Sequence, residues 1–420
     1  MTSPGATMDE ASSAVGLSMS LAAFSEEIFR SIKRADQRRW AHAYLAGLLR
    51  TPGKKSVRRL AHAVSTSPNA AQSLRQFVST SSWDWETVLR ELADWAVRHE
   101  PASALAIERL VIPKSGKRSV GVHRYFDPHS GRALNCQLGV GAFLTIGSTQ
   151  VPVDWRLHLP APWTEDAQLR RRARIPDAVQ YRPLWAQVLD LVDALASRTA
   201  TTGIPLVTDM SDAPHVGSFL RGLGQRGLDC VITLPHYLKV HPVDECGPFG
   251  PTLAGARECV SKTRAVESVP VTTVDGRQRN AQVRSALVRL PTGRAPGSAE
   301  GPFRVFTEVI RGDRHGPVWI TNLTHLPLAD VMSLTTLRAS TGTTLCAMKR
   351  DLGLSDFEGR SFPGWHHHVT LVSAAHAYQR LAPLAPGSSA RLPLRWVAPR
   401  EGAEPTTATS APGTQDAPSA

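Results

Sequence analysis

The sequence contains little cysteine and no long hydrophobic run. Its five cysteines include no CxxC pair, which argues against a disulfide framework or a zinc knuckle. Nowhere do about 18 apolar residues run together, and residues 1–17 lack the basic and apolar regions of a signal peptide. There is no GxSxG or P-loop motif, so serine hydrolase and nucleotide-binding functions have no support. We therefore expect a cytoplasmic protein without a membrane segment.

Acidic residues are in short supply. Aspartate and glutamate number 36 against 48 lysines and arginines, which gives a formal net charge of +12 over 420 residues. Such an excess favours polyanionic partners, because binding them releases their counterions. Nucleic acid is the leading candidate, and the protein would then work at the nucleoid. A soluble protein whose arginines are merely solvated remains the alternative, since charge alone does not define a partner.

Composition and periodicity divide the chain into six segments. Residues 1–17 and 384–420 are rich in small residues or proline and are predicted to be disordered. Residues 18–100 carry apolar residues at helical spacing, and Asp84 is a candidate N-cap for the helix that follows it. We expect an N-terminal, all-helical domain there.

A group of basic residues in this helical domain is a candidate DNA-binding surface. The segment that carries them has an apolar side at Val57 and Leu60, so its basic residues face the other way. Side chains so placed can hold phosphates, although an ordinary solvated helix face is equally compatible. The candidates are Lys54, Lys55, Arg58 and Arg59.

From residue 101 the pattern changes to short, β-branched apolar runs. Four strand candidates separated by turn residues predict an antiparallel meander over 105–160. Two further runs at 204–210 and 229–235 predict buried parallel strands in β-α-β order, with helices predicted at 184–197 and 215–225. This order is compatible with a ribonuclease-H-like fold, of which residues 101–238 would form the first part.

The rest of the chain is predicted to interrupt and then complete that core. Residues 239–323 are rich in glycine, proline and strand-like runs and suggest a β-rich insertion. Residues 324–383 contain two helical segments, Leu334–Leu354 and Trp365–Tyr378, which would return to the core. The predicted fold class is α/β, with a ribonuclease-H-like core, a β-rich insertion and an N-terminal helical domain.

Four ordered blocks carry a family resemblance. They are PKSGKRSVGV (113–122), NCQLGV (135–140), LHLPAPWTEDAQLRRRARIP (157–176) and GWHHH (364–368). These blocks resemble conserved segments of the insertion-sequence transposases of the 701 type, within the insertion-sequence 4 superfamily. The resemblance covers most of residues 20–380 and implies a DDE core, in which three acidic residues bind divalent metal ions.

The helix from Leu334 to Leu354 resembles that family's Tyr-x2-Arg-x3-Glu-x6-Lys signature. Arg338 and Lys349 match in register, and the resemblance implies that they contact DNA. Thr335 stands where the family has tyrosine, and Gly342 stands where it has the third catalytic acid. A glycine inside a helix costs about 1 kcal/mol relative to alanine, so this replacement does not stabilise the helix.

The same resemblance places the other two acids. Glu108 matches the first catalytic position, and Arg109 beside it is expected to point to the opposite face of the strand. Asp209 is the better match for the second, although an ungapped alignment puts Met210 there. Glu108 and Asp209 would thus be the catalytic and metal-binding residues, holding Mg²⁺ or Mn²⁺ if the protein is active. Other acids that could replace the missing third ligand are Asp351, Glu308 and Asp330.

Three functions remain open. The first is a decayed or domesticated transposase that binds DNA, such as the terminal inverted repeats of an insertion sequence, without cutting it, either alone or as a homodimer. The second is an active transposase with an altered acidic triad, and the third is a protein-interaction remnant. The run His366, His367 and His368 is expected to be structural or DNA-facing, because adjacent helical residues point in different directions and no second ligand cluster accompanies them.

Overall fold

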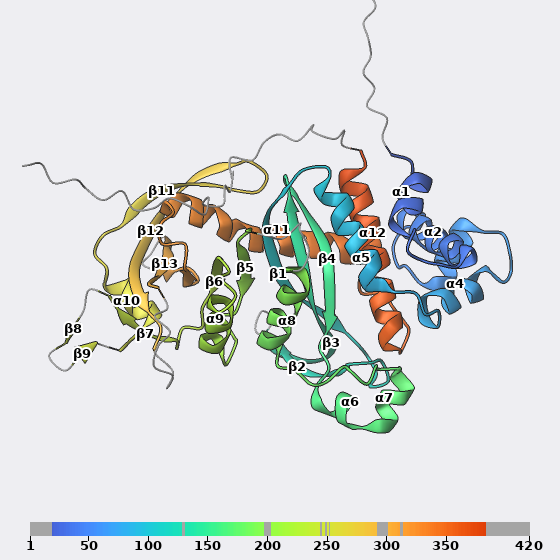
Figure 1. Ribbon diagram of the computed structural model, residues 1–420, viewed down its shortest axis with the longest axis horizontal. Helices are drawn as coiled ribbons and strands as arrows, with labels where there is room; N and C mark the ends of the chain where they lie inside the picture. The colour runs from blue at the N-terminus through green and yellow to red at the C-terminus, as the bar shows by residue number, and fades with distance from the viewer. Residues whose placement is uncertain are drawn as a thin grey trace, which may run out of the picture.

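The computed structural model describes residues 19–127, 131–196, 203–243, 246–247, 250–251, 253–291, 301–310 and 314–383 (Figure 1). The two segments predicted to be disordered, 1–17 and 384–420, lie outside the described residues. No described helix is both long and apolar enough to cross a membrane.

The described part of the chain begins with five helices, which lie together at one end of the molecule (Figure 1). The last of them starts where the sequence predicts, because the Asp84 carboxylate accepts hydrogen bonds from the backbone N–H groups of Glu86 and Thr87. Their buried faces pack on one another and on a helix from the C-terminal part of the chain. They are α1 (Leu21–Ile28), α2 (Ala35–Arg50), α3 (Val57–Val64), α4 (Ala70–Ser79) and α5 (Trp85–Val97).

The four strands that follow are β1 (Ala102–Pro113), β2 (His123–Asp127), β3 (Arg132–Ile146) and β4 (Thr149–Leu157). The long β3 pairs antiparallel with β1, with β2 and with β4. The predicted meander is therefore wrong in one respect, since β1 pairs with β3 and not with β2. The physical reason is length: β3 is long enough for its first half to pair with β2 and its second half with β4. Two short helices, α6 (Ala161–Glu165) and α7 (Ala167–Ala173), come next.

The predicted β-α-β unit is confirmed. Strand β5 (Leu206–Asp209) pairs in parallel with β1 and with β6 (Cys230–Thr233), and α9 (Val216–Gly224) connects β5 to β6. All four residues of each of these strands are buried, as their apolar runs indicate. The helix before them is α8 (Leu184–Ala196).

The segment predicted to be a β-rich insertion continues the same sheet. Strand β15 pairs antiparallel with β6, and β13, β12 and β7 extend the sheet outward from it. The elements are β7 (Lys239–Pro242), β8 (Cys246–Gly247), β9 (Gly250–Pro251), β10 (Ala254–Gly255), α10 (Ala256–Lys262), β11 (Glu267–Thr272), β12 (Gln278–Arg289), β13 (Phe303–Ile310), β14 (Arg314–His315) and β15 (Trp319–Thr321).

Two long helices complete the fold. Helix α11 (Leu328–Leu352) crosses the sheet and contacts β11, β5 and β1, and helix α12 (Phe362–Leu381) packs on β4, α2 and α5 (Figure 1). Helix α11 ends at Gly353, whose φ of 67° is a left-handed conformation that glycine adopts without a Cβ clash. The predicted α/β class, with an N-terminal helical region, is confirmed.

Candidate active site

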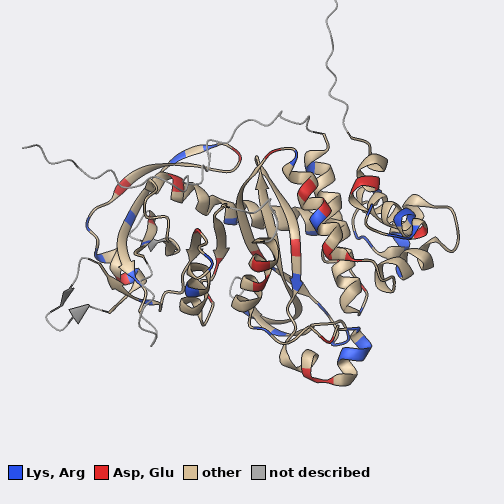
Figure 2. Ribbon diagram, viewed as in Figure 1, with Lys and Arg blue, Asp and Glu red and all other residues tan. Residues whose placement is uncertain are grey.

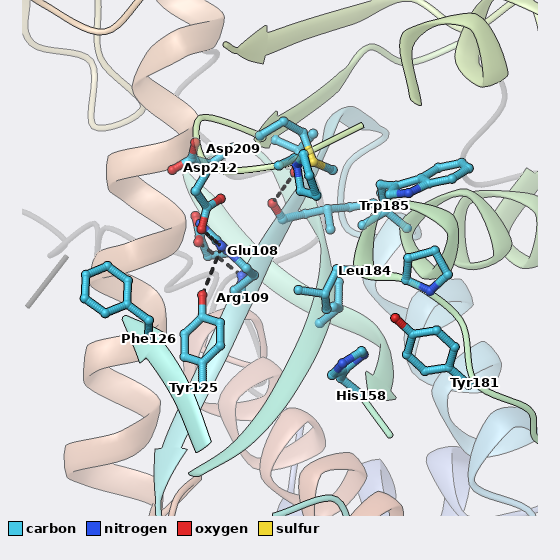
Figure 3. Close-up of a pocket in the computed structure, with 18 of the residues that line it drawn as sticks. Glu108, Arg109, Tyr125, Phe126, His158, Tyr181, Leu184, Trp185, Asp209 and Asp212 are labelled. Atoms are coloured by element: carbon cyan, nitrogen blue, oxygen red, sulfur yellow. Dashed lines mark hydrogen bonds and ion pairs between the residues drawn. The ribbon is translucent and has the colours of Figure 1, made fainter. Parts of the chain in front are cut away.

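A cleft of about 600 Å³ opens beside the carboxyl end of β5 (Figure 3). Strand β5 pairs with β1 only as far as Thr208 and Ile107, so the next residues, Asp209 and Glu108, reach the cleft together. Its charged lining residues are Glu108, Arg109, Arg124, Asp209 and Asp212, and its aromatic wall contains Tyr125, Phe126, Tyr181 and Trp185.

Both oxygens of the Asp209 carboxylate accept hydrogen bonds from the protein. One oxygen accepts hydrogen bonds from the Thr233 hydroxyl and, at 2.9 Å, from the Ser211 N–H, and the other pairs with the Arg338 guanidinium. The Asp209 side chain is only 2% exposed. Burial alone would raise the pKa of this carboxyl, but Arg338 and the two hydrogen bonds outweigh burial and hold the pKa below its usual value. Asp209 is therefore ionised, and the positive charge of Arg338 neutralises it.

The Glu108 carboxylate lies in a different environment. It is largely buried, and one oxygen accepts a hydrogen bond of 3.1 Å from the backbone N–H of Arg109. Burial raises the pKa of Glu108, and the negative charge of Asp209 raises it further. The two acids therefore lie close enough to affect each other, with their pKa values moved in opposite directions.

Arg109 lines the same cleft as Glu108, which corrects the expectation that it points away. Because β5 covers the edge of β1 only up to Ile107, residues beyond that point can reach the open space from either face of the strand. The Arg109 guanidinium pairs with Asp212 at 2.5 Å and donates to the Tyr125 hydroxyl at 3.1 Å (Figure 3). The sequence analysis does not identify Asp212 as a site residue. Its position three residues after Asp209 is the signal that could have placed it at the same end of β5.

One face of α11 closes over these acids. Arg338 reaches Asp209, and the Lys349 ammonium donates to the Val111 carbonyl of β1 at 3.3 Å. Burial lowers the pKa of Lys349. Gly342 lies four residues after Arg338 and seven before Lys349, so it shares their face of the helix. A Cβ at Gly342 would meet no heavy atom of the described residues within 4 Å, apart from the helix's own backbone and its chain neighbours.

A match to a protein-family model identifies the family of this chain. The family model of the DDE superfamily endonucleases matches residues 27–290, which is more than half of the chain. The chain belongs to the DDE superfamily endonucleases. The α/β fold with its helical N-terminal region agrees with the ribonuclease-H-like core expected for this family. No curated protein sequence matches the chain.

Among solved structures, the chain is similar to a cryo-EM structure of piggyBac transposase in a synaptic complex with hairpin DNA. The identity is 12% and the TM-score is 0.39, with 86% of this chain and 71% of that chain covered.

DDE nucleases typically use divalent metal ions, but the acids of this cleft do not form a ligand set for them. The described residues bring no three His, Cys, Asp or Glu side chains together in a group that could hold a metal ion. Both Asp209 oxygens are taken by Arg338, Thr233 and Ser211, and Asp212 is taken by Arg109. Mg²⁺ and Mn²⁺ require several free oxygen ligands, so the residues present do not fit these ions.

Introducing a carboxylate at residue 342 should strengthen metal binding. In Gly342→Glu the new side chain has room, and the helix should gain about 0.5 kcal/mol because glycine is the weaker helix former. The introduced carboxylate could also accept the Arg338 guanidinium one turn away and so release Asp209. We expect Mn²⁺ affinity, measured by electron paramagnetic resonance titration, to rise about tenfold or more. Equal affinities in Gly342→Glu and the uncharged control Gly342→Gln would contradict this.

The other sequence candidates for the third acid lie elsewhere. Asp351 pairs with Arg350, and Glu308 pairs with Arg279. Asp330 is exposed in the first turn of α11. None of the three lines the cleft beside Asp209.

The four basic residues proposed for DNA contact differ in their surroundings. Lys55 is 4% exposed, its ammonium donates to the Thr51 carbonyl, and burial lowers its pKa. Lys55 is buried because the end of α11 covers it: Gly353 lies against its side chain, and the Asp356 carboxylate accepts a hydrogen bond of 2.7 Å from its backbone N–H. Lys54 is exposed and pairs with Glu358 at 2.8 Å, and Arg58 and Arg59 are exposed.

The histidine run of α12 is buried. His367 lies with its two ring nitrogens 2.9 and 3.0 Å from the carbonyl oxygens of Val78 and Trp83. His368 bridges the Tyr44 hydroxyl and the Gly353 carbonyl, each at 3.0 Å. These contacts join α12 to the N-terminal helices and to the end of α11, so His367 and His368 have structural positions.

Proposed function

We propose that this DDE endonuclease family member binds DNA without cutting it. The observation that carries the proposal is the ion pair in which Arg338 neutralises Asp209. On the same face of α11, Gly342 stands where the family resemblance places the third carboxylate. Phosphoryl transfer in such a site depends on metal ions that activate the nucleophile and stabilise the displaced oxygen. Without ligands for them, the cleft can hold a DNA strand but cannot hydrolyse it.

Exposed arginines supply the attraction for DNA. Arg124 is exposed and lines the cleft, and Arg171 and Arg172 are exposed in the last turn of α7, where the ribbon in Figure 2 is blue for basic residues. Arg58 and Arg59 add a second basic surface on α3. Phosphate contacts of this kind provide affinity and position without reading sequence.

The sequence blocks that resemble those of the 701-type transposases support the terminal inverted repeats of an insertion sequence as the DNA. Two inverted ends are most simply held by two copies of the chain, so the proposal includes a homodimer. Such a protein would occupy element ends and compete there with an active transposase.

DNA binding should be strongly salt-dependent. We expect Arg58→Ala/Arg59→Ala to lower the slope of log affinity against log salt by up to about 2, because each lost phosphate contact removes about 0.9. Fluorescence anisotropy with a labelled repeat duplex measures this slope. The control is Lys262→Ala, which removes an exposed lysine paired with Glu258 on α10 and should leave the slope unchanged. A folded protein without salt-sensitive binding would refute the proposal.

An active enzyme with an altered triad is the second candidate, and Asp212 is the observation that favours it. Asp212 lines the same cleft as Glu108 and Asp209, and so could supply a third carboxylate. In the structure Arg109 holds it at 2.5 Å. The candidate therefore requires both arginines to release their acids, and it predicts metal-dependent nicking that is lost in Asp212→Ala.

A further inference from the structure

Exposed aromatic side chains gather around the candidate active-site cleft. Among the described residues, three aromatic side chains are largely exposed: Phe126 at 60%, and Tyr181 and Tyr237 at 49% each. Phe126 and Tyr181 line the cleft, and the Tyr237 hydroxyl donates to the carbonyl of another lining residue, Ala213, at 2.8 Å. Exposed apolar side chains that are grouped mark an interaction site, whereas scattered ones do not. The grouping around one cleft therefore indicates a ligand with apolar faces.

A row of aromatic rings crosses this cleft. The Tyr125 ring centroid lies 6.3 Å from that of His123, which lies 5.5 Å from that of His158. The His158 centroid lies 6.3 Å from that of Tyr181. Figure 3 shows Tyr125 and His158 between Phe126 and Tyr181, which lie on opposite sides of the cleft. The rings of the row meet edge to face, an arrangement that aromatic pairs favour, so they stabilise one another's positions.

The charges at the cleft favour a polyanion. Asp209 and Asp212 are each neutralised by an arginine, so two of the three acids that line the cleft do not repel phosphates. Arg124 is exposed, lines the cleft and pairs with no acid of the described residues. It lies on β2 two residues before Phe126, so the two side chains share a face of the strand. A nucleic acid strand combines the flat apolar faces and the negative charge that match these side chains.

The size of the cleft favours one strand over two. Its volume of about 600 Å³ corresponds to a cube with an edge of roughly 8 Å, whereas the major groove alone of a double helix is about 12 Å wide. Pockets of about 300–1,000 Å³ hold small ligands of the size of a base. Unpaired bases can offer a face to a protein ring, whereas bases inside a duplex stack on one another. The cleft therefore suits the bases of a single strand.

We propose that the candidate active-site cleft binds a single strand of DNA, with bases stacked on Phe126 and Tyr181 and phosphates near Arg124. This proposal rests on the DNA-binding function above and adds the form of DNA that the cleft takes. Stacking on aromatic rings tolerates any sequence, because every base has a flat face. The basic surfaces on α3 and α7 remain available for duplex DNA.

Strands with and without bases isolate the contribution of stacking. Fluorescence anisotropy in one buffer of fixed salt compares a thymidine strand, an abasic strand with the same number of phosphates, and a duplex. Each is about 12 nucleotides long, within the usual site sizes of proteins that bind single strands. We expect the thymidine strand to bind about tenfold more tightly than the abasic strand, because the two carry equal charge and differ only in their bases.

Two variants assign this preference to the exposed rings. Phe126→Ala and Tyr181→Ala remove side chains that are largely exposed, so neither should impair folding. Each should lower the ratio of thymidine to abasic affinity by about fivefold or more. Tyr181→Phe retains the ring and should retain the ratio. The matched control Ile310→Ala removes an apolar side chain that is 50% exposed on β13, outside the cleft, and should also retain it.

The outcomes separate this proposal from the DNA-binding function. A thymidine preference that falls in both alanine variants and persists in Tyr181→Phe and Ile310→Ala supports the single-strand cleft, whether or not the duplex binds. Duplex binding with equal affinities for the thymidine and abasic strands overturns the cleft proposal alone. A preference that persists in either alanine variant also overturns it. Absence of duplex binding refutes the function proposed above, and absence of binding by all three DNAs overturns both.

Discussion

Replacing Arg338 with methionine is expected to lower the free energy of unfolding by about 3 kcal/mol, because it leaves the Asp209 carboxylate buried without its counter-ion. The Asp209 side chain is 2% exposed, so the Arg338 guanidinium and two hydrogen bonds, and not bulk water, solvate its charge. Urea denaturation at pH 7 measures the change. The double variant Asp209→Asn/Arg338→Met should recover much of the loss, since no charge then remains unpaired.

The matched control for this prediction lies on the same helix. Arg350 pairs with Asp351 in an exposed position, with side chains that are 73% and 48% exposed. Arg350→Met should therefore change the free energy of unfolding by less than about 1 kcal/mol. Equal effects of Arg338→Met and Arg350→Met would show that Arg338 does not neutralise a buried charge.

Acid should destabilise the protein well before its carboxylates titrate. Burial lowers the pKa values of His367, His368 and His376 to about 4. The unfolded chain binds these protons near pH 6.5 and the folded chain only near pH 4, so stability falls as pH decreases through this interval. At pH 5 each ring should cost about 2 kcal/mol relative to pH 7.5.

Urea midpoints measured between pH 7.5 and pH 5 test this dependence. His376→Gln removes one of the three rings and retains a donor toward the Gln150 carbonyl, which His376 contacts at 3.0 Å. The dependence should then become weaker by about 2 kcal/mol over the same range. The control His62→Gln replaces an exposed histidine of α3 and should leave the dependence unchanged. A midpoint that does not vary with pH would contradict the prediction.

The sequence predicted the elements of the fold better than their pairing. Apolar periodicity located the parallel strands β5 and β6, the connecting helix and both C-terminal helices, because these signals are local. The pairing of β1 with β3 depends on the length of β3, and the continuation of the sheet through β15 depends on a contact with β6. Neither of these strand pairings can be predicted from the local periodicity of the sequence.

Within the site, motif spacing predicted residues but not their partners. The helical signature placed Arg338 and Gly342 on one face, and the family resemblance matched Glu108 and Asp209 to the first two acids. The sequence could not show that Arg338 neutralises Asp209, that Arg109 reaches Asp212, or that Lys55 is buried. The two ion pairs join segments about 100 or more residues apart, and the burial of Lys55 depends on docking against the end of α11.

DNA binding without cleavage is tested most directly by a strand-cleavage assay on repeat-containing DNA that is fully bound. The assay contains Mg²⁺ or Mn²⁺ and compares the natural protein with Asp209→Ala and Asp212→Ala. We predict no nicked product from the natural protein under conditions in which it remains bound. Metal-dependent nicking by the natural protein that Asp209→Ala abolishes would contradict this prediction, and its additional loss in Asp212→Ala would identify the third acid.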